Sequence, residues 1–207
     1  PTMAGFINFE DAPSRGLQDN QAVGTAYKAD FGVTFTAGYL EGVGNDKDPD
    51  GFKPSLFVVD EGLVPGLGNW FLRSSGTFND GNAFAPLIIE YDNPTRASGF
   101  DIWDIDGRPD ATEQYQIDTF LGGNSVGTIL SPIGDSTGSN SLNGKPWRAE
   151  ISGAWFDKIV LTFNGTKTDD IGLAFDRFST TTVPEPGTLA LLGLGLVGLG
   201  AARRRKA

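Results

Sequence analysis

Short apolar runs separated by clusters of Gly, Asn, Asp and Pro follow one another over residues 1–181. None holds a period of 3.6 residues for three turns, as an amphipathic helix would. Several alternate instead: Val33 and Phe35 are interleaved with Thr34 and Thr36, as in a strand with one buried face. The pattern therefore predicts an all-β domain. Its expected strands are residues 5–10, 30–37, 55–59, 70–74, 85–91, 97–105, 113–120, 125–130, 147–151, 156–163 and 172–178.

The sequence Gly122-Gly123-Asn124 separates two of these strands and predicts a hairpin turn. So many short strands in one domain favour a two-sheet antiparallel β-sandwich of the jelly-roll type. The polar, Gly-rich stretches at residues 42–53 and 134–145 are expected to be loops, where binding residues concentrate in such folds.

The composition changes abruptly after residue 179. We expect a β-sandwich domain over residues 1–179, a linker over 180–187, a hydrophobic helix over 188–202 and a basic end over 203–207. The uncharged segment has 15 residues, fewer than the roughly 20 that span a bilayer comfortably. Its four glycines disfavour a helix buried in a soluble domain, so we expect a membrane segment with its basic end on the cytoplasmic side.

The order of a Pro-Glu-Pro motif, a Gly-rich apolar segment and a basic end resembles the PEP-CTERM sorting signal of Gram-negative bacteria. The residues that carry this resemblance are Pro184, Glu185, Pro186, Arg203, Arg204 and Arg205. The resemblance implies export, transient anchoring in the inner membrane by the tail, and cleavage near the motif by an exosortase. It also implies a final location in the cell envelope or an extracellular polysaccharide matrix, and we expect the export signal peptide to have been removed.

Composition excludes several classes of activity. The chain has no Cys and no His, so Ser-His-Asp triads, cysteine nucleophiles and His- or Cys-ligated metals are absent. With 26 acidic and 16 basic residues, the formal net charge of −10 argues against nucleic acid as a partner. Divalent hard cations such as Ca²⁺ suit such a chain better.

One candidate calcium site is an acidic loop with alternating carboxylates, Asp46, Asp48 and Asp50, followed by Gly51. Phe57 occupies the position where an EF-hand has Glu, so this is not an EF-hand, and a solvated acidic turn is the alternative.

A second candidate is the pair Asp104 and Asp106, which a regular strand places on one face. Two carboxylates there repel unless Ca²⁺, Arg108 or solvent lies between them, and all three remain open.

A third candidate joins the two ends of the domain. A first strand ending in Phe9-Glu10-Asp11 and a last strand containing Phe175-Asp176-Arg177-Phe178 are similar to the arrangement in galactose-binding-like jelly rolls, which include many carbohydrate-binding modules. That resemblance implies a structural Ca²⁺ held by Glu10 or Asp11 together with Asp176. Asp176 in an apolar strand also calls for a partner, with Arg177 as the alternative.

Aromatic residues offer surfaces on which sugar rings stack, although core packing is the alternative for each of them. Trp147 follows a polar loop and is the best candidate, and Tyr39 and Asn45 are candidates for the same polysaccharide site.

Three hypotheses follow. The first is a non-catalytic, calcium-stabilised, exported β-sandwich that binds polysaccharide or contributes to a biofilm. The second is a self-assembling structural subunit that associates through sheet edges or faces. The third is a carbohydrate-active enzyme with a carboxylate pair, either Asp104 with Glu113 or Asp101 with Asp110. The first is preferred, with no catalytic residues.

Overall fold

A computed structural model describes residues 5–18, 21–42, 68–74, 86–103, 105, 107–134, 145–168 and 174–179, with the backbone alone at 37–42, 74 and 108. The predicted strand at 55–59, the loops at 43–53 and 135–144, and the tail after residue 179 lie outside this part of the chain. Within it, no helix is long and apolar enough to cross a membrane.

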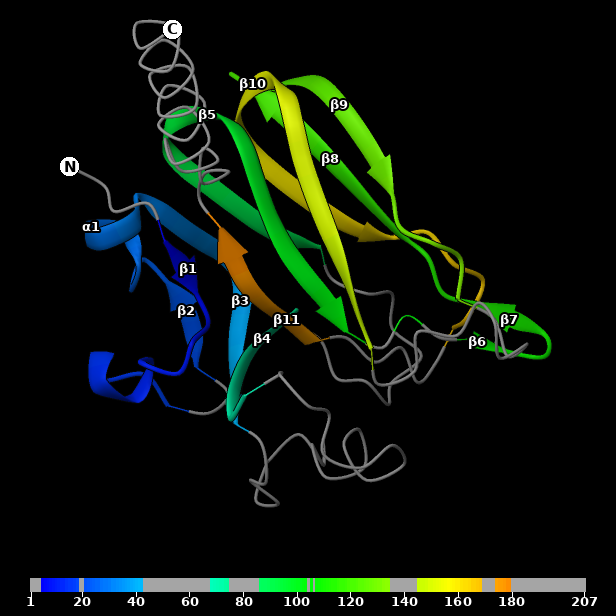
Figure 1. Ribbon diagram of the computed structural model, residues 1–207, viewed down its shortest axis with the longest axis horizontal. Helices are drawn as coiled ribbons and strands as arrows, with labels where there is room; N and C mark the ends of the chain where they lie inside the picture. Colours follow the sequence, from blue (N-terminus) through cyan, green and yellow to red (C-terminus); the bar gives the residue numbers. More distant parts are fainter. Residues whose placement is uncertain are drawn as a thin grey trace, which may run out of the picture.

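Antiparallel strands dominate the described residues (Figure 1). The main sheet has nine strands in the order β1-β11-β4-β3-β5-β10-β8-β9, with β2 paired to β3. Its strands are β1 (Phe6–Ile7), β2 (Ala22–Gly24), β3 (Val33–Gly42), β4 (Trp70–Ser74), β5 (Leu87–Trp103), β8 (Tyr115–Leu121), β9 (Asn124–Leu130), β10 (Pro146–Phe163) and β11 (Ala174–Ser179). A separate pair contains β6 (Gly107–Arg108) and β7 (Ala111–Thr112).

The two longest strands give the sheet its shape. β5 has 17 residues and β10 has 18, and they pair along their length except where both bulge. Both strands turn at the top of Figure 1, so the sheet folds over at this point. On its other edge β5 pairs first with β3 and then with β11, and both of these strands pair with β4. These four strands therefore form a closed ring of pairings, in the order β3, β4, β11, β5 and back to β3.

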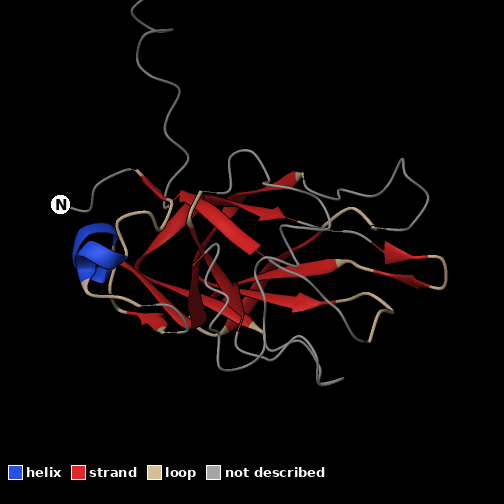
Figure 2. Ribbon diagram, turned by 90° about the horizontal axis from the view of Figure 1, so that it is seen from below, coloured by secondary structure: helices blue, strands red, loops and turns tan. Residues whose placement is uncertain are grey.

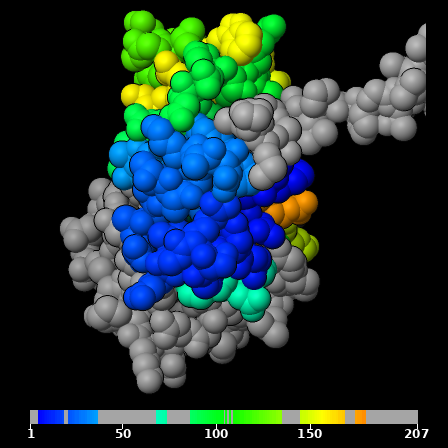
Figure 3. Space-filling model, turned by 90° about the vertical axis from the view of Figure 1, so that its left-hand side faces the viewer, coloured from blue at the N-terminus to red at the C-terminus, as the bar shows by residue number. Residues whose placement is uncertain are grey.

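Two short helices lie at one end of the molecule (Figure 2). The 3₁₀-helix η1 (Pro13–Arg15) and the helix α1 (Lys28–Phe31) each end at a glycine in the left-handed conformation, Gly16 and Gly32. In the view of Figure 3, the N-terminal part of the chain, drawn in blue, faces the viewer at the middle of this side. α1 occupies the start of the strand predicted at 30–37, so that strand begins only at Val33.

The core is rich in interlocking aromatic rings. Phe9 contacts Tyr27, Phe35 and Phe178 edge to face, with ring centroids 5.5–5.8 Å apart. Phe178 also stacks on Phe100, with centroids 5.0 Å apart. These rings come from the N-terminal segment, β3, β5 and β11, so the core ties together the elements of the closed pairing.

The all-β antiparallel prediction is confirmed, as is the hairpin between β8 and β9. The two-sheet sandwich is not confirmed, because all described strands except β6 and β7 belong to one continuous sheet. Residues 85–91 and 97–105 were expected to be two strands, and so were 147–151 and 156–163. Each pair is one strand, β5 or β10, because the Asp-Asn-Pro-Thr-Arg and Ser-Gly-Ala-Trp segments between them form bulges instead of connections. The strand β2 was not predicted.

Candidate functional site

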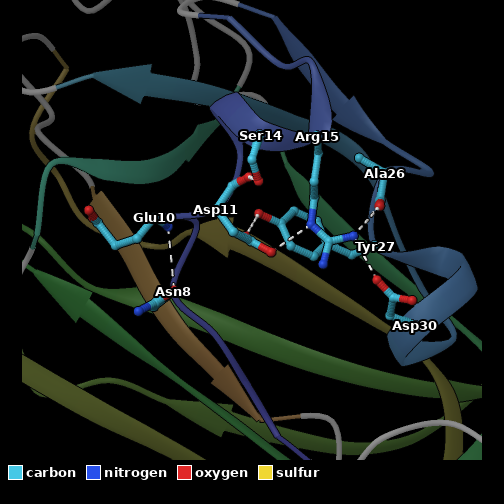
Figure 4. Close-up of polar contacts among 8 residues, drawn as sticks. All are labelled: Asn8, Glu10, Asp11, Ser14, Arg15, Ala26, Tyr27 and Asp30. Carbon is cyan, nitrogen blue, oxygen red and sulfur yellow. Dashed lines mark hydrogen bonds and ion pairs between the residues drawn. The ribbon is translucent and has the colours of Figure 1, made fainter.

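Asp11 binds two neighbours within the N-terminal segment and the loop before α1 (Figure 4). Its Oδ2 accepts a hydrogen bond from Arg15 Nε at 2.7 Å, and its Oδ1 accepts one from the Tyr27 hydroxyl at 2.8 Å. Arg15 continues to Asp30 at 2.8 Å and lies over the Tyr27 ring. Burial and the nearby Asp11 carboxylate raise the pKa of Tyr27, so its hydroxyl stays a donor. Asp11 therefore joins η1 to α1.

Glu10 holds the start of β4. Its Oε1 accepts hydrogen bonds from the backbone N–H groups of Asn69 at 2.7 Å and Trp70 at 3.0 Å, and its Oε2 accepts one from Asn69 Nδ2 at 3.1 Å. Gly68 has φ +83°, and a side chain there would collide with the Glu10 carboxylate. The close approach of this carboxylate to the backbone thus requires glycine at position 68.

Asp101 and Asp176 form a pair of buried carboxylates on neighbouring strands. They lie directly opposite each other on β5 and β11. Arg148 Nη1 lies 3.0 Å from Asp101 Oδ1, and Arg177 Nη1 lies 3.3 Å from its Oδ2. Two guanidinium groups therefore compensate the charge of Asp101.

Asp176 is compensated far less. Among the described residues, the hydrogen bond to its carboxylate comes from the backbone N–H of Arg177, at 2.7 Å to Oδ1. Arg177 itself has φ +53°, an uncommon conformation for a residue with a side chain. Burial, with a smaller contribution from the negative charges of Asp101 and Glu10, raises the pKa of Asp176 to about 7. Its carboxyl group therefore changes charge near neutral pH.

These contacts bear on the predicted calcium ligands. The described residues contain no group of three or more His, Cys, Asp or Glu side chains that could hold a metal ion. Glu10 lies near enough to Asp176 to affect its pKa, whereas Asp11 is bonded to Arg15 and Tyr27. The other predicted ligands lie outside the described residues: Asp46, Asp48, Asp50, Asp104 and Asp106. Calcium binding stays a prediction.

Of the three predicted sugar-binding residues, the structure describes the side chain of Trp147. Trp147 is half-buried and packs against the core. Tyr39 lies in β3 opposite Arg73, where the backbone alone is described, and Asn45 lies outside the described residues. Trp155 is the tryptophan that the structure exposes, with 52% of its surface accessible.

Ion pairs hold two of the four carboxylates considered for hydrolysis, Glu113 and Asp101. Asp104 lies outside the described residues. Glu113 is buried, and its Oε1 lies 2.8 Å from Lys167 Nζ, which is also buried. Asp101 is buried between Arg148 and Arg177.

Comparison with known proteins places the tail in a defined class. Residues 182–206 match the family described as the PEP-CTERM protein-sorting motif. This match contains all six tail residues that suggested it, Pro184, Glu185, Pro186, Arg203, Arg204 and Arg205. A search of curated proteins found no match to the chain.

The chain accordingly carries a sorting signal of exported proteins. Such a signal anchors its protein transiently in the membrane before an exosortase, a membrane enzyme, processes it.

Proposed function

We propose that this exported β-domain is a non-catalytic polysaccharide-binding protein of the bacterial envelope or extracellular matrix. The observation that carries the proposal is the sorting motif at residues 182–206, because export brings the domain to the polysaccharides that surround the cell. The engagement of Asp101 and Glu113 in ion pairs supports a role without catalysis.

Binding to the polysaccharide of the producing cells is the direct test. The protein purified from the outside of those cells is run through native gels that contain their exopolysaccharide. Retarded migration, with no release of reducing sugar ends, is the expected result. Single-site affinities of about 1 µM to 1 mM would suffice, because many copies in a matrix act together. Unchanged migration at millimolar repeat units, with the protein folded, would contradict binding, and release of reducing ends would indicate an enzyme.

Removal of the tail is expected to precede this role. Cleavage near Pro184–Pro186 that releases Arg203, Arg204, Arg205 and Lys206 changes the formal net charge from −10 to −14. Mass spectrometry of the extracellular protein checks this expectation. If most extracellular molecules retain the basic end, the protein is permanently anchored or assembled through its tail.

Calcium is proposed as a structural ion of the domain. The support is that the buried Asp176 carboxylate faces Asp101, lies near Glu10 and has one local hydrogen bond among the described residues. A cation bound only by the folded protein stabilises it by about 2.7 kcal/mol at a hundredfold excess over its Kd. Melting in Ca²⁺ and in EDTA tests this. A shift that Asp176→Asn abolishes locates the ion there, a shift that persists moves it to Asp46–Asp50, and equal melting contradicts calcium binding.

A structural subunit is the alternative that one observation favours. β9 is the last strand of the main sheet, and its seven residues include no charge and no proline. Such an edge lacks the usual protection against pairing with another copy. Sedimentation velocity over a range of concentrations distinguishes the two roles: assembly that Val126→Lys prevents favours the subunit, and a monomer at all concentrations favours the binding domain.

A further inference from the structure

We propose that Trp155 and Arg96 form a sugar-stacking site for a neutral polysaccharide at the bend of the sheet. This inference rests on the proposed function and names the residues that perform it. The site lies on the crest, which we define as residues 92–96 of β5 and 152–155 of β10.

The crest exists because both strands bulge at the same place. Ser152 pairs with Ala97 and Phe156 with Thr95, so three residues of β10 face one residue of β5. The next pairing joins Lys158 to Glu90, so four residues of β5 then face one of β10. Bulges bend a strand and redirect its side chains, and they occur often beside functional sites. Here they turn Trp155 away from the core.

The exposure of Trp155 distinguishes it from the other tryptophans. Trp70 and Trp147 pack partly against the core, and Trp103 is buried. The 52% exposure of Trp155 leaves part of its ring surface accessible to a ligand. Gly153 and Ala154 beside it are exposed, and a side chain built on Gly153 would meet no atom within 4 Å. The main chain two residues before Trp155 is therefore open to solvent.

Arg96 supplies fixed polar groups at the same point. Its Nε donates a hydrogen bond to the Gly153 carbonyl at 3.0 Å, and its guanidinium carbon lies 5.6 Å from the centre of the Trp155 ring. The Arg96 side chain is exposed, which gives a ligand access to its terminal amino groups. A planar guanidinium held in this way presents several N–H donors in a defined direction.

An exposed indole beside fixed donors suits a pyranose ring. Arg96 lies over one face of the indole, so the C–H face of the sugar packs on the other face, and hydroxyl groups at the edge of the ring accept hydrogen bonds from Arg96. The net charge of −10 disfavours a polyanion, so the ligand is expected to be uncharged.

Affinity electrophoresis of the full chain tests the site with two probes, the exopolysaccharide of the producing cells and dextran as a neutral glucan. Trp155→Ala is expected to weaken binding to the exopolysaccharide by about tenfold, and Trp155→Phe by less, because a smaller ring still stacks. Arg96→Gln is expected to weaken it by about threefold. Leu130→Ala is the matched control, because it truncates another exposed apolar side chain on a different strand. Its binding should be unchanged.

The outcomes separate the two proposals. Loss of binding in Trp155→Ala, with an unchanged melting temperature and an intact Leu130→Ala control, supports the crest site. If the wild-type chain binds the exopolysaccharide and Trp155→Ala binds equally well, the crest site is wrong and the proposed function stands. If the wild-type chain binds neither probe, both are wrong. Binding to dextran that Trp155→Ala weakens in the same way supports the choice of a neutral sugar, and binding only to an acidic exopolysaccharide overturns it.

Discussion

The second half of β5 and the strand β9 differ strongly in how far their residues are buried. Residues 97–103 of β5 are all buried, with β10 on one edge and β11 on the other. None of the seven residues of β9 is fully buried, and β9 pairs with β8 on one edge. One antiparallel sheet thus contains a strand enclosed by protein and a strand largely open to water.

Polar side chains on the two strands also have different partners. Asp101 cannot reach water, so Arg148 on the neighbouring strand neutralises it at 3.0 Å. On β9, Thr128 bonds to Asp118 at 2.6 Å in an exposed setting, where water offers both groups alternative partners. A buried polar residue depends on the protein groups that contact it, whereas an exposed one can exchange them for water. Substitutions should therefore destabilise the enclosed region much more than the open one.

The largest effect is expected from Phe100→Ala. Phe100 is fully buried and stacks on Phe178, so the truncation should lower the free energy of unfolding by about 3–5 kcal/mol. Ile129→Ala on β9 removes a partly buried side chain and should cost about 1 kcal/mol. Urea denaturation of both variants measures the difference. Similar costs would show that the core extends to β9 as strongly as to β5.

Arg148→Met should follow, with a cost of about 3 kcal/mol, because it leaves the buried Asp101 with one weaker partner. Arg148 also donates hydrogen bonds to the Arg177 carbonyl at 2.7 Å and to Ser179 Oγ at 2.9 Å. Arg177→Met is the control: its side chain is 54% exposed and lies farther from Asp101, so it should cost less than about 1 kcal/mol.

A double variant separates the effect of the uncompensated charge from the effect of lost packing. Asp101→Asn combined with Arg148→Met should recover part of the lost stability, because no uncompensated carboxylate remains. If the double variant is as unstable as the sum of the two single ones, packing and not charge explains the cost of losing Arg148.

The same contrast explains what could be predicted of the fold. Residues 115–120 alternate between apolar and polar positions, and the structure has β8 there, with Tyr115, Ile117 and Thr119 buried. The second half of β5 is buried on both faces, so alternation carries no information about it, and its pairing partners come from distant parts of the sequence. The bulges were mistaken for connections because a bulge and a turn use the same residues, Gly, Pro, Asn and Asp.

The candidate site was predictable only where one residue was out of place in its local pattern. Asp176 lies among phenylalanines, and this alone indicated that it needs a partner. The role of Arg148 was missed because it lies 47 residues from Asp101 along the chain. Trp155 was one of the aromatic residues considered for sugar stacking, but Trp147 was preferred, because the exposure of Trp155 depends on the coincidence of two bulges, one on each of two long strands.

Asp176 should make stability depend on pH in an unusual direction. Its pKa is about 7 when folded and 3.8 in the reference state, so the folded protein binds the proton more tightly. This contribution to stability is fully present below pH 3.8 and is lost as pH rises through 7. Between pH 5.5 and 8.5 it should fall by about 2 kcal/mol, since one pKa unit corresponds to about 1.4 kcal/mol.

Denaturation in EDTA at the two pH values measures this loss. Asp176→Asn should remove most of it and should be more stable than the wild-type protein at pH 8.5. Asp92→Asn removes a surface carboxylate paired with Lys28 and should leave the pH dependence unchanged. If wild-type and Asp176→Asn respond equally to pH, Asp176 does not titrate in this range.

The smallest effect is expected at the hairpin turn between β8 and β9, where a substitution tests the backbone conformation alone. Gly122 and Gly123 connect β8 to β9 with φ of +55° and +85°, as a two-residue hairpin turn with positive φ at both positions requires. A side chain built on either glycine meets no atom within 4 Å, so Gly123→Ala introduces no collision. It should still cost about 1 kcal/mol, because a residue with Cβ is strained in the left-handed region. Gly122→Asn should cost a few tenths of a kcal/mol, because Asn adopts this conformation more readily. Urea denaturation ranks the two variants. Equal, negligible costs would mean that the hairpin in solution uses another turn and that β9 is held to β8 less firmly than its paired backbone indicates.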